Sequence, residues 1–443
     1  MDVGKVASLY IHGSEQAVAG NEMLMTAVLR RPYDPAALRR AYRRFVEENP
    51  TIASKLVENP ARQAFTWLPF SDEERASRVE REERELAFVH DPRDAHDAYY
   101  PTNERLPFRI VPVGASTLLF CVNHAFSNGK GLLAWVSRWF ETYAEELGEP
   151  VPARKAWPAV TLPPGGLRGF FAAVAGLFWT IVYLVGFIAR AGKRAAVDTV
   201  DLGDLGDRKG EPLCRQGFVV KTYRFTTDDT ARVVAAAKAR GLTVGQHLGA
   251  ALSELFFDAQ PDRGRVCMSM PLDLRGELPH LSLQALGNYT GSLVVQVHRG
   301  GDAASQLRAA YRWLARRIPY WLTWMVGGTT ESKLFRRFAE QARRPNAARA
   351  PLENFTFALS NIGRIDDPVL AHFLEDISGH TRTQTIFLAV STFNRRLAIE
   401  VSFARDLYPE GAVLAVLDRL PARALKAPSA VGAGAADESL AAA

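Results

Sequence analysis

Apolar residues recur at helical spacing in some stretches of the chain and cluster as they do in strands in others. Residues 34–48 combine an acidic cap, a proline just inside it and apolar positions three and four apart, which predicts an amphipathic helix. The apolar run at 117–123 predicts a strand, and a Ser-Asn-Gly turn leads from it into a helix expected at 130–146. This part of the chain is therefore a unit of strand, turn and helix.

The same patterns predict the elements on either side of this unit. Three further strands are expected before it, at 65–69, 86–90 and 108–113. The densely charged residues 72–85 predict a solvated helix or loop. A second folded stretch follows the Gly/Asp-rich linker 198–211. It is expected to begin with a strand and two helical stretches, at 218–225, 228–239 and 243–257.

Between the two stretches, residues 170–189 form a run of twenty positions without a charged side chain. A helix of that length can span a bilayer. Arg168 precedes the run, and Arg190, Lys193 and Arg194 follow it, so charge asymmetry assigns no orientation. The organisation expected is an N-terminal lobe at 1–165, an apolar insert and linker at 166–210, a C-terminal lobe at 211–426 and a disordered tail at 427–443.

Composition narrows the class of protein. With 443 residues, 47% hydrophobic and 23% charged, the chain is large enough to bury two cores. Its 54 basic and 48 acidic residues give a formal charge of +6 that is spread along the chain, so nucleic acid is not an expected partner. Three cysteines without a CxxC pair favour a reducing compartment. Residues 1–13 lack the pattern of a secretory signal, and a cytoplasmic location is expected.

The candidate chemistry lies in the unit of strand, turn and helix. His124 stands where the strand ends, shortly before the turn of Ser127, Asn128 and Gly129, so its imidazole is expected at a strand end that faces a cleft. A neutral imidazole there can accept a proton from a hydroxyl or an amine, which is the role of a general base. On spacing alone, a structural role for this histidine remains open.

Other catalytic classes lack their minimal residues. The sequence has no GxSxG elbow, no HExxH and no phosphate-binding loop, which argues against a serine hydrolase, a zinc peptidase and a nucleotide hydrolase. No metal site is expected in the polar loop that carries His90, Asp91, Asp94, His96 and Asp97, because it has no apolar frame.

Four segments, in order, resemble the motifs of one acyltransferase superfamily. Residues 123–129, Asn-His-Ala-Phe-Ser-Asn-Gly, resemble its HHxxxDG signature. This superfamily includes chloramphenicol acetyltransferase, the condensation domains of peptide synthetases, the plant BAHD enzymes, alcohol acetyltransferases and wax ester synthases. Its later motifs are an Arg-ending strand before a Gly-Asn pair, a Ser-Asn-x-Gly strand end and a final hairpin. The similar segments here are 270–275 with 286–289, then 359–363, then 387–394 with 397–403.

The resemblance implies a fold and a role for each matched residue. The fold is α/β (α+β), with two chloramphenicol acetyltransferase-like lobes, each a mixed sheet flanked by helices, and an active site in a channel between them. His124 matches the second histidine of the signature, which acts as the general base, and Asn123 replaces the first. The signature aspartate, which pairs with an arginine of the second lobe, corresponds to Asn128, and that arginine to Arg275.

Asn128 is the main departure from the family pattern, because an amide removes the charge-assisted part of the pairing with Arg275. Either Arg275 is more hydrated than usual, or another carboxylate such as Asp273 helps it, or the site is weakened. Gly129 is expected to let the chain turn tightly into the helix. Oxyanion or substrate contacts are expected from Asn123, Asn288, Tyr289, Ser360 and Asn361, for each of which a turn or strand-end hydrogen bond is the structural alternative.

The implied reaction is acyl transfer from a thioester. A thioester carbonyl is already activated, so the enzyme needs to align the acceptor, remove its proton and stabilise an oxyanion. The donor is expected to be acyl-CoA or an acyl carrier protein, with no bound cofactor and no metal, and the acceptor a hydroxyl, or an amine, of a small hydrophobic molecule or lipid. The alternative is a catalytically inactive homologue that binds acyl chains or a carrier protein, which the asparagines at 123 and 128 suggest.

The catalytic interpretation limits the options for the apolar insert. A single crossing by residues 170–189 would place His124 and Arg275 on opposite sides of a membrane, although both belong to one implied site. The remaining options are a helix lying in one leaflet, a re-entrant hairpin and a helix over an acyl tunnel. The first is favoured because both flanks are basic and can meet anionic headgroups. We therefore expect a cytoplasmic protein with a peripheral membrane contact.

Overall fold

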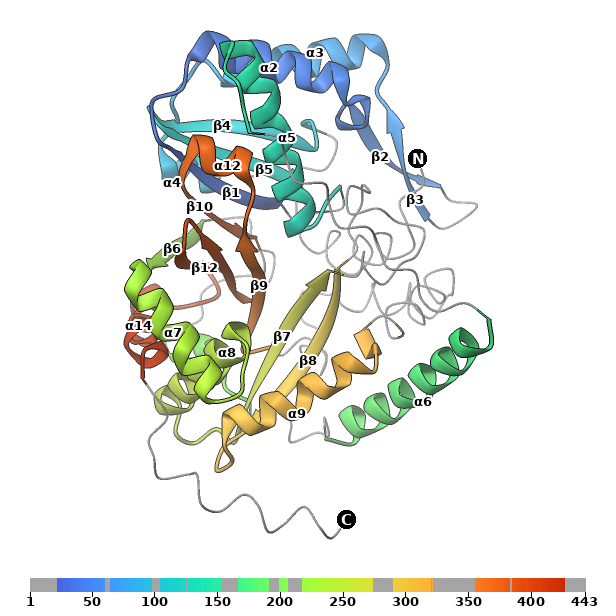
Figure 1. Ribbon diagram of the computed structural model, residues 1–443, viewed down its shortest axis with the longest axis vertical. Coiled ribbons are helices and arrows are strands. Elements are labelled where there is room, and N and C mark those ends of the chain that lie inside the picture. The colour runs from blue at the N-terminus through green and yellow to red at the C-terminus, as the bar shows by residue number, and fades with distance from the viewer. Residues whose placement is uncertain are drawn as a thin grey trace.

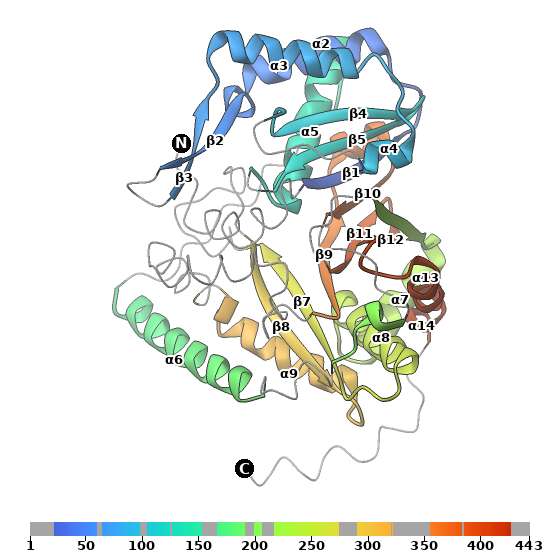
Figure 2. The same cartoon turned by 180° about the vertical axis from the view of Figure 1, so that it is seen from behind.

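The computed structural model describes residues 22–59, 64–97, 104–124, 126–152, 166–190, 199–205, 217–273, 290–319, 321, 355–382 and 385–426. They form two units that follow one another along the longest axis, each a β-sheet with helices packed against it (Figures 1 and 2). Each unit has its own large hydrophobic core. The α/β fold class expected from the sequence is therefore confirmed.

The first sheet is antiparallel and has four strands. In spatial order they are β10 (Leu374–Thr381), β1 (Glu22–Leu29), β5 (Thr117–Asn123) and β4 (Phe108–Gly114). The helices that share its core are α2 (Pro35–Glu48), α5 (Gly129–Leu147) and α12 (Pro368–Phe373). The elements between α2 and β4 are η2 (Pro50–Ile52), β2 (Ser54–Asn59), β3 (Ala64–Pro69), α3 (Asp72–Glu85) and α4 (Pro92–Asp97).

Local sequence explains why the helices of this unit begin where they do. The side chain of Asp34 accepts hydrogen bonds from the first backbone N–H groups of α2, and Pro35 follows it, a combination that favours helix initiation. Helix α5 ends at Gly148, whose φ of 68° is the left-handed conformation that glycine adopts at low cost. Where the sheet meets α5, Phe120 of β5 packs edge-on against Trp139 of that helix. The strand and the helix on either side of His124 therefore share one core.

The second sheet is mixed and has six strands. In spatial order they are β6 (Phe218–Arg224), β12 (Arg396–Ala404), β11 (Ile386–Phe393), β9 (Phe357–Ile365), β7 (Arg265–Asp273) and β8 (Thr290–His298). Strand β9 runs parallel to both of its neighbours, and the other pairs are antiparallel. The remaining elements of this unit are η3 (Leu202–Leu205), α7 (Thr227–Ala239), α8 (Val244–Ala259), α9 (Ala303–Ala315), α13 (Glu410–Leu417) and α14 (Leu420–Ala424).

Near the C-terminal end, one segment of the chain leaves the second unit, joins the first unit and then returns. We call it the exchanged segment. After β9 in the second sheet, the chain forms α12 and β10, which belong to the core of the first unit, and then returns to the second sheet as β11. Strand β10 pairs with β1, so the first sheet is completed by residues more than three hundred positions away. The lobe boundaries expected from the sequence did not include this exchange.

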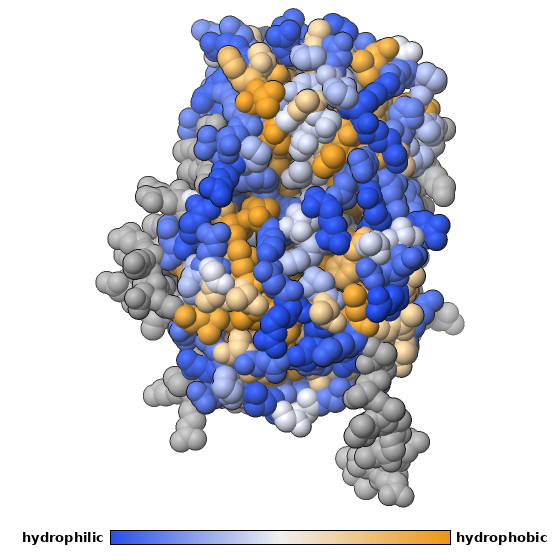
Figure 3. All heavy atoms as spheres, turned by 90° about the vertical axis from the view of Figure 1, so that its left-hand side faces the viewer, coloured by the Kyte–Doolittle hydropathy of each residue, from blue (hydrophilic) through white to orange (hydrophobic). Residues whose placement is uncertain are grey.

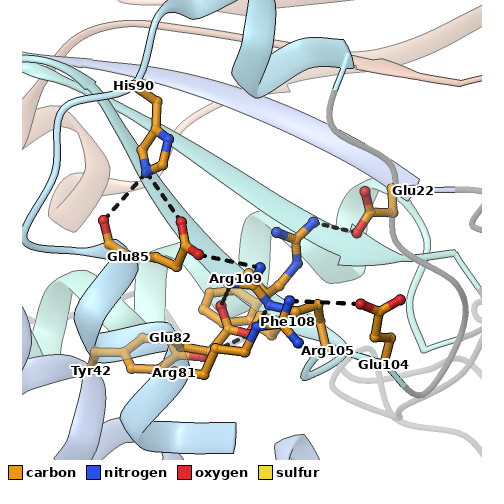
Figure 4. Close-up of polar contacts among 10 residues, drawn as sticks. All are labelled: Glu22, Tyr42, Arg81, Glu82, Glu85, His90, Glu104, Arg105, Phe108 and Arg109. Carbon is orange, nitrogen blue, oxygen red and sulfur yellow. Dashed lines mark hydrogen bonds and ion pairs between the residues drawn. The ribbon is translucent and has the colours of Figure 1, made fainter. Parts of the chain in front are cut away.

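Charged residues are part of the first unit's interior. Glu82 of α3 and Arg105 are both buried and form a salt bridge whose hydrogen bond from Arg105 Nε is 2.7 Å long. Arg109 of β4 donates to Glu22 of β1 over 2.6 Å, and Figure 4 shows the two pairs close together. Residues 72–85 form the expected helix, but one of its carboxylates is paired in the interior rather than solvated.

Helix α6 (Gly166–Arg190) lies outside both sheets, alongside α9 at the edge of the second unit (Figures 1 and 2). Trp179 and Tyr183 of α6 each pack edge-on against Trp313 of α9, with ring centroids 5.8 Å apart in both pairs. Among the described residues, no helix is both long and apolar enough to cross a membrane. The insert is therefore a single continuous helix docked on the second unit.

Most elements expected within the described residues are confirmed, including the helix at 34–48 and the strand at 117–123. The strand expected at 86–90 is wrong. Leu86 ends α3 and is buried, whereas Phe88 and Val89 lie in the following turn and are 63% and 62% exposed. This apolar run joins no sheet, and its pattern alone led to the wrong prediction of a strand. The tail expected to be disordered, 427–443, lies outside the described residues.

Candidate active site

The candidate site is built on the turn between β5 and α5. The carbonyl oxygen of Asn123, the last residue of β5, accepts hydrogen bonds from the backbone N–H groups of Phe126 (2.9 Å) and Ser127 (3.3 Å). Asn128 is the N-cap of α5, and its Oδ1 accepts from the backbone N–H of Gly131 over 3.0 Å. The turn that carries His124 is therefore fixed at both ends by hydrogen bonds.

Asn128 also connects this turn to the second unit. Its Nδ2 donates a hydrogen bond of 3.1 Å to Oδ1 of Asp273, the last residue of β7. The two contacts of Asn128 assign its amide, because Oδ1 meets a backbone donor and Nδ2 meets a carboxylate acceptor. The sequence suggested that the carboxylate of Asp273 pairs with Arg275. The structure places Asp273 in contact with Asn128.

A second hydrogen bond ties α5 to the segment that the units exchange. Ser137, which is fully buried, donates from its hydroxyl to Oδ2 of Asp367 over 2.7 Å. Asp367 follows β9 and caps α12, with its Oδ1 accepting from the N–H groups of Val369 and Leu370. Sequence reasoning missed this pair. Its signal was the Asp-Pro step at 367–368, which is typical of a helix start.

These two hydrogen bonds reach Asp273 at the end of β7 and Asp367 just after β9, and these two neighbouring strands separate from each other. Among the described residues, β7 and β9 pair only at Met268 with Phe357 and at Ser269 with Ala358. Beyond those pairs the two strands diverge toward the first unit (Figure 1). The end of β7 is bound to the start of α5, and the connection that leaves β9 is bound to the middle of α5. The helix that follows His124 thus bridges the opening of the second sheet.

His124 lies in an almost completely enclosed position, 7% exposed. Burial lowers its pKa from 6.5 to about 4, because desolvation disfavours the imidazolium ion. Hydrogen bonds with its own backbone and with that of Ser127 act in the opposite direction and are weaker. The imidazole is therefore neutral at pH 7, which is the state that a general base needs.

The other residues predicted for the site fall into two groups. Arg275, Asn288 and Tyr289 lie outside the described residues, so the structure does not place them. Ser360 and Asn361 lie on β9, in the part that has separated from β7. Oδ1 of Asn361 accepts a hydrogen bond from the backbone N–H of Gly363 over 3.0 Å, which is the strand-end role considered as its structural alternative.

The backbone conformation of Gly129 does not require glycine. It is the first residue of α5, and its φ is not among the positive values of the described backbone. A Cβ added to Gly129 would have no heavy atom within 4 Å. The turn itself does not require glycine, and the space in front of this residue is open.

No group of three or more potential metal ligands occurs among the described side chains. His96, which belonged to the polar loop considered in the sequence, instead faces His380 with ring centroids 5.0 Å apart. His380 contacts the buried carboxylate of Glu400 over 2.6 Å. This cluster joins the two units through paired side chains.

Comparison with known proteins bears on the fold. No protein-family model matches the sequence, and no curated protein matches it. Solved structures do match along nearly the whole chain. The first condensation domain of the CDA synthetase is 15% identical, with a TM-score of 0.60 over 96% of this chain and 95% of that one. The chain has the condensation-domain fold.

Two further solved structures extend this similarity. A variant of the starter condensation domain of rhizomide synthetase in complex with C8-CoA is 13% identical, with a TM-score of 0.59 over 97% of this chain and 95% of that one. Polyketide synthase associated protein 5 from Mycobacterium tuberculosis is 15% identical, with a TM-score of 0.58 over 96% of this chain and 98% of that one. The fold implied by the motifs of the sequence is confirmed.

Proposed function

We propose that this protein is an acyltransferase that moves an acyl group from a thioester, on CoA or on an acyl carrier protein, to a hydroxyl group of a hydrophobic acceptor. The observation that carries the proposal is the position of His124. It is a buried, neutral imidazole on the turn where the first unit is hydrogen-bonded to the second. The condensation-domain fold supports the same reaction class, since one structure with this fold is a complex with C8-CoA.

In the proposed reaction, the acceptor hydroxyl attacks the carbonyl carbon of the thioester while His124 removes the hydroxyl proton. The tetrahedral intermediate then collapses, the carbon–sulfur bond breaks, and the proton passes from the imidazolium to the departing thiolate. The products are an ester and a free thiol. No covalent intermediate on the protein is needed, because a thioester is already activated and positioning accounts for much of the rate.

Supporting roles follow from the residues around this turn. Asn128 and Asp273 position the turn, and Ser137 with Asp367 positions the helix after it. Ser360 is our candidate for a substrate contact on β9, since Asn361 already accepts a hydrogen bond within the strand end. Asn123, Asn288 and Tyr289 remain predicted contacts for the oxyanion or the substrate, and Arg275 remains a predicted structural support.

We also propose that the reaction takes place at a lipid surface, with a cytoplasmic protein bound peripherally through residues 170–189. A long-chain donor and a lipid-like acceptor are both poorly soluble in water, and a surface concentrates them. Helix α6, which contains this run, exposes a row of large apolar side chains.

The test is the release of free thiol from acyl-CoA in the presence of a lipid extract. His124→Ala is expected to lower kcat/KM by at least about 100-fold, the usual contribution of a general base, with an unchanged thermal midpoint. His372→Ala is the matched control, because the His372 side chain is 37% exposed on α12, away from the turn. Equal rates for the parent and His124→Ala would eliminate the role of base. Saturable binding of acyl-CoA without turnover by either protein would instead identify an inactive acyl-binding homologue.

A further inference from the structure

Helix α6 carries most of the exposed apolar surface of the described chain. Eleven large apolar side chains are exposed among the described residues, and eight of them belong to this one helix. Such a concentration marks an interaction surface, since exposed apolar side chains are normally scattered. The eight side chains, which we call the α6 stripe, are Leu167, Phe170, Phe171, Val174, Phe178, Ile181, Val182 and Val185.

The α6 stripe forms a continuous band along the helix. At about 100° per residue, all eight positions fall within an arc about 120° wide. At about 1.5 Å per residue, the band from Leu167 to Val185 is about 27 Å long. A band of this width is the face that an amphipathic helix normally turns toward a protein core. Here it faces away from both cores.

The opposite face of α6 is already occupied by the second unit. The hydroxyl of Tyr183 donates to the backbone carbonyl of Val294 in β8 over 2.7 Å. The guanidinium of Arg316 lies over the ring of Trp179 at 3.9 Å. A Cβ added to Gly176 would come within 2.0 Å of the indole of Trp321, so this side of the helix is in close contact. The helix is therefore oriented by its inner face, and the α6 stripe points outward.

The sequence that contains α6 carries charges of one sign. The sequence from 150 to 197 contains no aspartate or glutamate, and its charged residues are Arg154, Lys155, Arg168, Arg190, Lys193 and Arg194. The neighbouring helix α9 carries the exposed Arg308 and Arg312, and the exposed Arg316 is its C-cap residue. Arg308 donates to the backbone carbonyl of Arg240, whereas Arg312 is exposed on the same ridge of α9. An apolar band beside exposed arginines, on a stretch of sequence without acidic residues, matches a surface of apolar chains beneath anionic headgroups.

The face of the molecule opposite α6 differs from this region. The face that Figure 3 shows lies on the other side of the molecule from α6, and hydrophilic side chains there interrupt the apolar ones. A second copy of the chain fits the α6 stripe less well than lipid, because a two-fold contact would bring the same arginine-rich borders together. Charge complementarity therefore favours an anionic membrane over a homodimer.

We propose that α6 lies flat on an anionic bilayer, with the α6 stripe among the acyl chains and the exposed Arg312 of α9 at the headgroups. This inference deepens the proposed lipid contact by naming the surface that makes it and the lipid charge that it requires. Membrane binding can be measured without turnover, so it can be judged separately from acyl transfer.

The experiment is co-flotation of the full chain with vesicles of phosphatidylcholine alone or mixed with phosphatidylglycerol. The parent is expected to float with the mixed vesicles and to bind phosphatidylcholine at least about tenfold more weakly, with affinity falling as salt is added. The test variant is Phe170→Ser with Phe178→Ser, which should weaken binding to mixed vesicles by at least about tenfold. The matched control is Phe88→Ser with Val89→Ser, which removes two equally exposed apolar side chains from the first unit and should bind as the parent does.

Three results would overturn the proposal. The first is a parent that floats with neither vesicle, and the second is a stripe variant that floats as well as the parent. The third is a parent that is dimeric by light scattering and becomes monomeric in the stripe variant, which would assign the α6 stripe to a second copy of the chain. His124→Ala separates this proposal from the enzymatic one, since it should keep full vesicle binding even if thiol release is lost.

Discussion

The side-chain nitrogen of Asn128 lies 3.1 Å from a carboxylate oxygen of Asp273, and this hydrogen bond joins the turn of the first unit to the last residue of β7. In the motif that the sequence resembles, the turn supplies the carboxylate. Here the turn supplies the donor and the second sheet supplies the carboxylate.

The first prediction concerns this reversal. Asn128→Asp keeps an oxygen to cap α5 through Gly131, but it places two carboxylates in contact across the two units. We expect the free energy of unfolding to fall by about 1–3 kcal/mol, together with a lower rate of thiol release. Chemical denaturation and the thiol assay measure the two effects.

Exchange of the two residues is the control for the first prediction. Asn128→Asp combined with Asp273→Asn restores one amide donor and one carboxylate acceptor, so it should recover most of the lost stability. A single Asn128→Asp variant that is as stable as the parent would show that the contact with Asp273 does not set the chemistry of the turn.

The elements on either side of His124 were predictable because each is encoded locally. The cap and spacing of α2 and the apolar run of β5 are patterns within about fifteen residues of chain. The false strand at 86–90 was an apolar run of the same kind, but Phe88 and Val89 have no sheet to enter. Local pattern does not distinguish these cases, because the difference lies in the tertiary partner.

Contacts between distant segments could not be predicted in the same way. Ser137 and Asp367 are 230 positions apart, and no local sequence pattern around either residue predicts that the two are in contact. The pairing of β10 with β1 likewise depends on the chain leaving the second sheet after β9 and returning to it. For the insert, the sequence indicated an apolar helix, whereas its outward face became clear only from the partners of Tyr183 and Gly176.

The second prediction concerns the pH dependence of the reaction. Burial lowers the pKa of His124 to about 4, so the base is already unprotonated well below neutral pH. We expect kcat/KM to be independent of pH near neutrality and to fall only as pH approaches about 4. A rate profile for thiol release, with a substrate that does not itself titrate in this range, measures the inflection. An inflection near 6.5 would contradict the burial of the catalytic imidazole.

The same shift affects stability in a defined direction. Between about pH 4 and 6.5, an unfolded chain binds a proton at position 124 that the folded chain does not bind. The unfolded state therefore gains relative to the folded state as pH falls through this window, and stability falls with it. His124→Gln removes this titration, so its unfolding free energy should decrease less than that of the parent between pH 7 and pH 4.

The third prediction uses the open space at the start of α5. A methyl group on Gly129 meets no heavy atom within 4 Å, so Gly129→Ala should leave stability unchanged or raise it by up to about 1 kcal/mol. If the thioester approaches His124 through this space, the same variant should raise KM for acyl-CoA several-fold. Gly411→Ala is the matched control, because Gly411 is in the first turn of α13 and its added methyl group also meets nothing within 4 Å. Equal KM values for the two variants would place the donor elsewhere.

The fourth prediction tests whether α5 must be tied to the exchanged segment for the site to work. Ser137→Ala leaves the partly buried carboxylate of Asp367 without its hydroxyl donor, which should cost about 1 kcal/mol of stability. It should also lower kcat for thiol release with little change in KM, because the helix after His124 loses one of the two hydrogen bonds that join it to Asp273 and Asp367. Asp367→Ser retains a capping oxygen for α12 on a shorter side chain, and a double-mutant cycle with Ser137→Ala isolates the coupling between the pair. A coupling energy near zero would mean that Asp367 serves only as the cap of α12 and does not help to position the helix after His124.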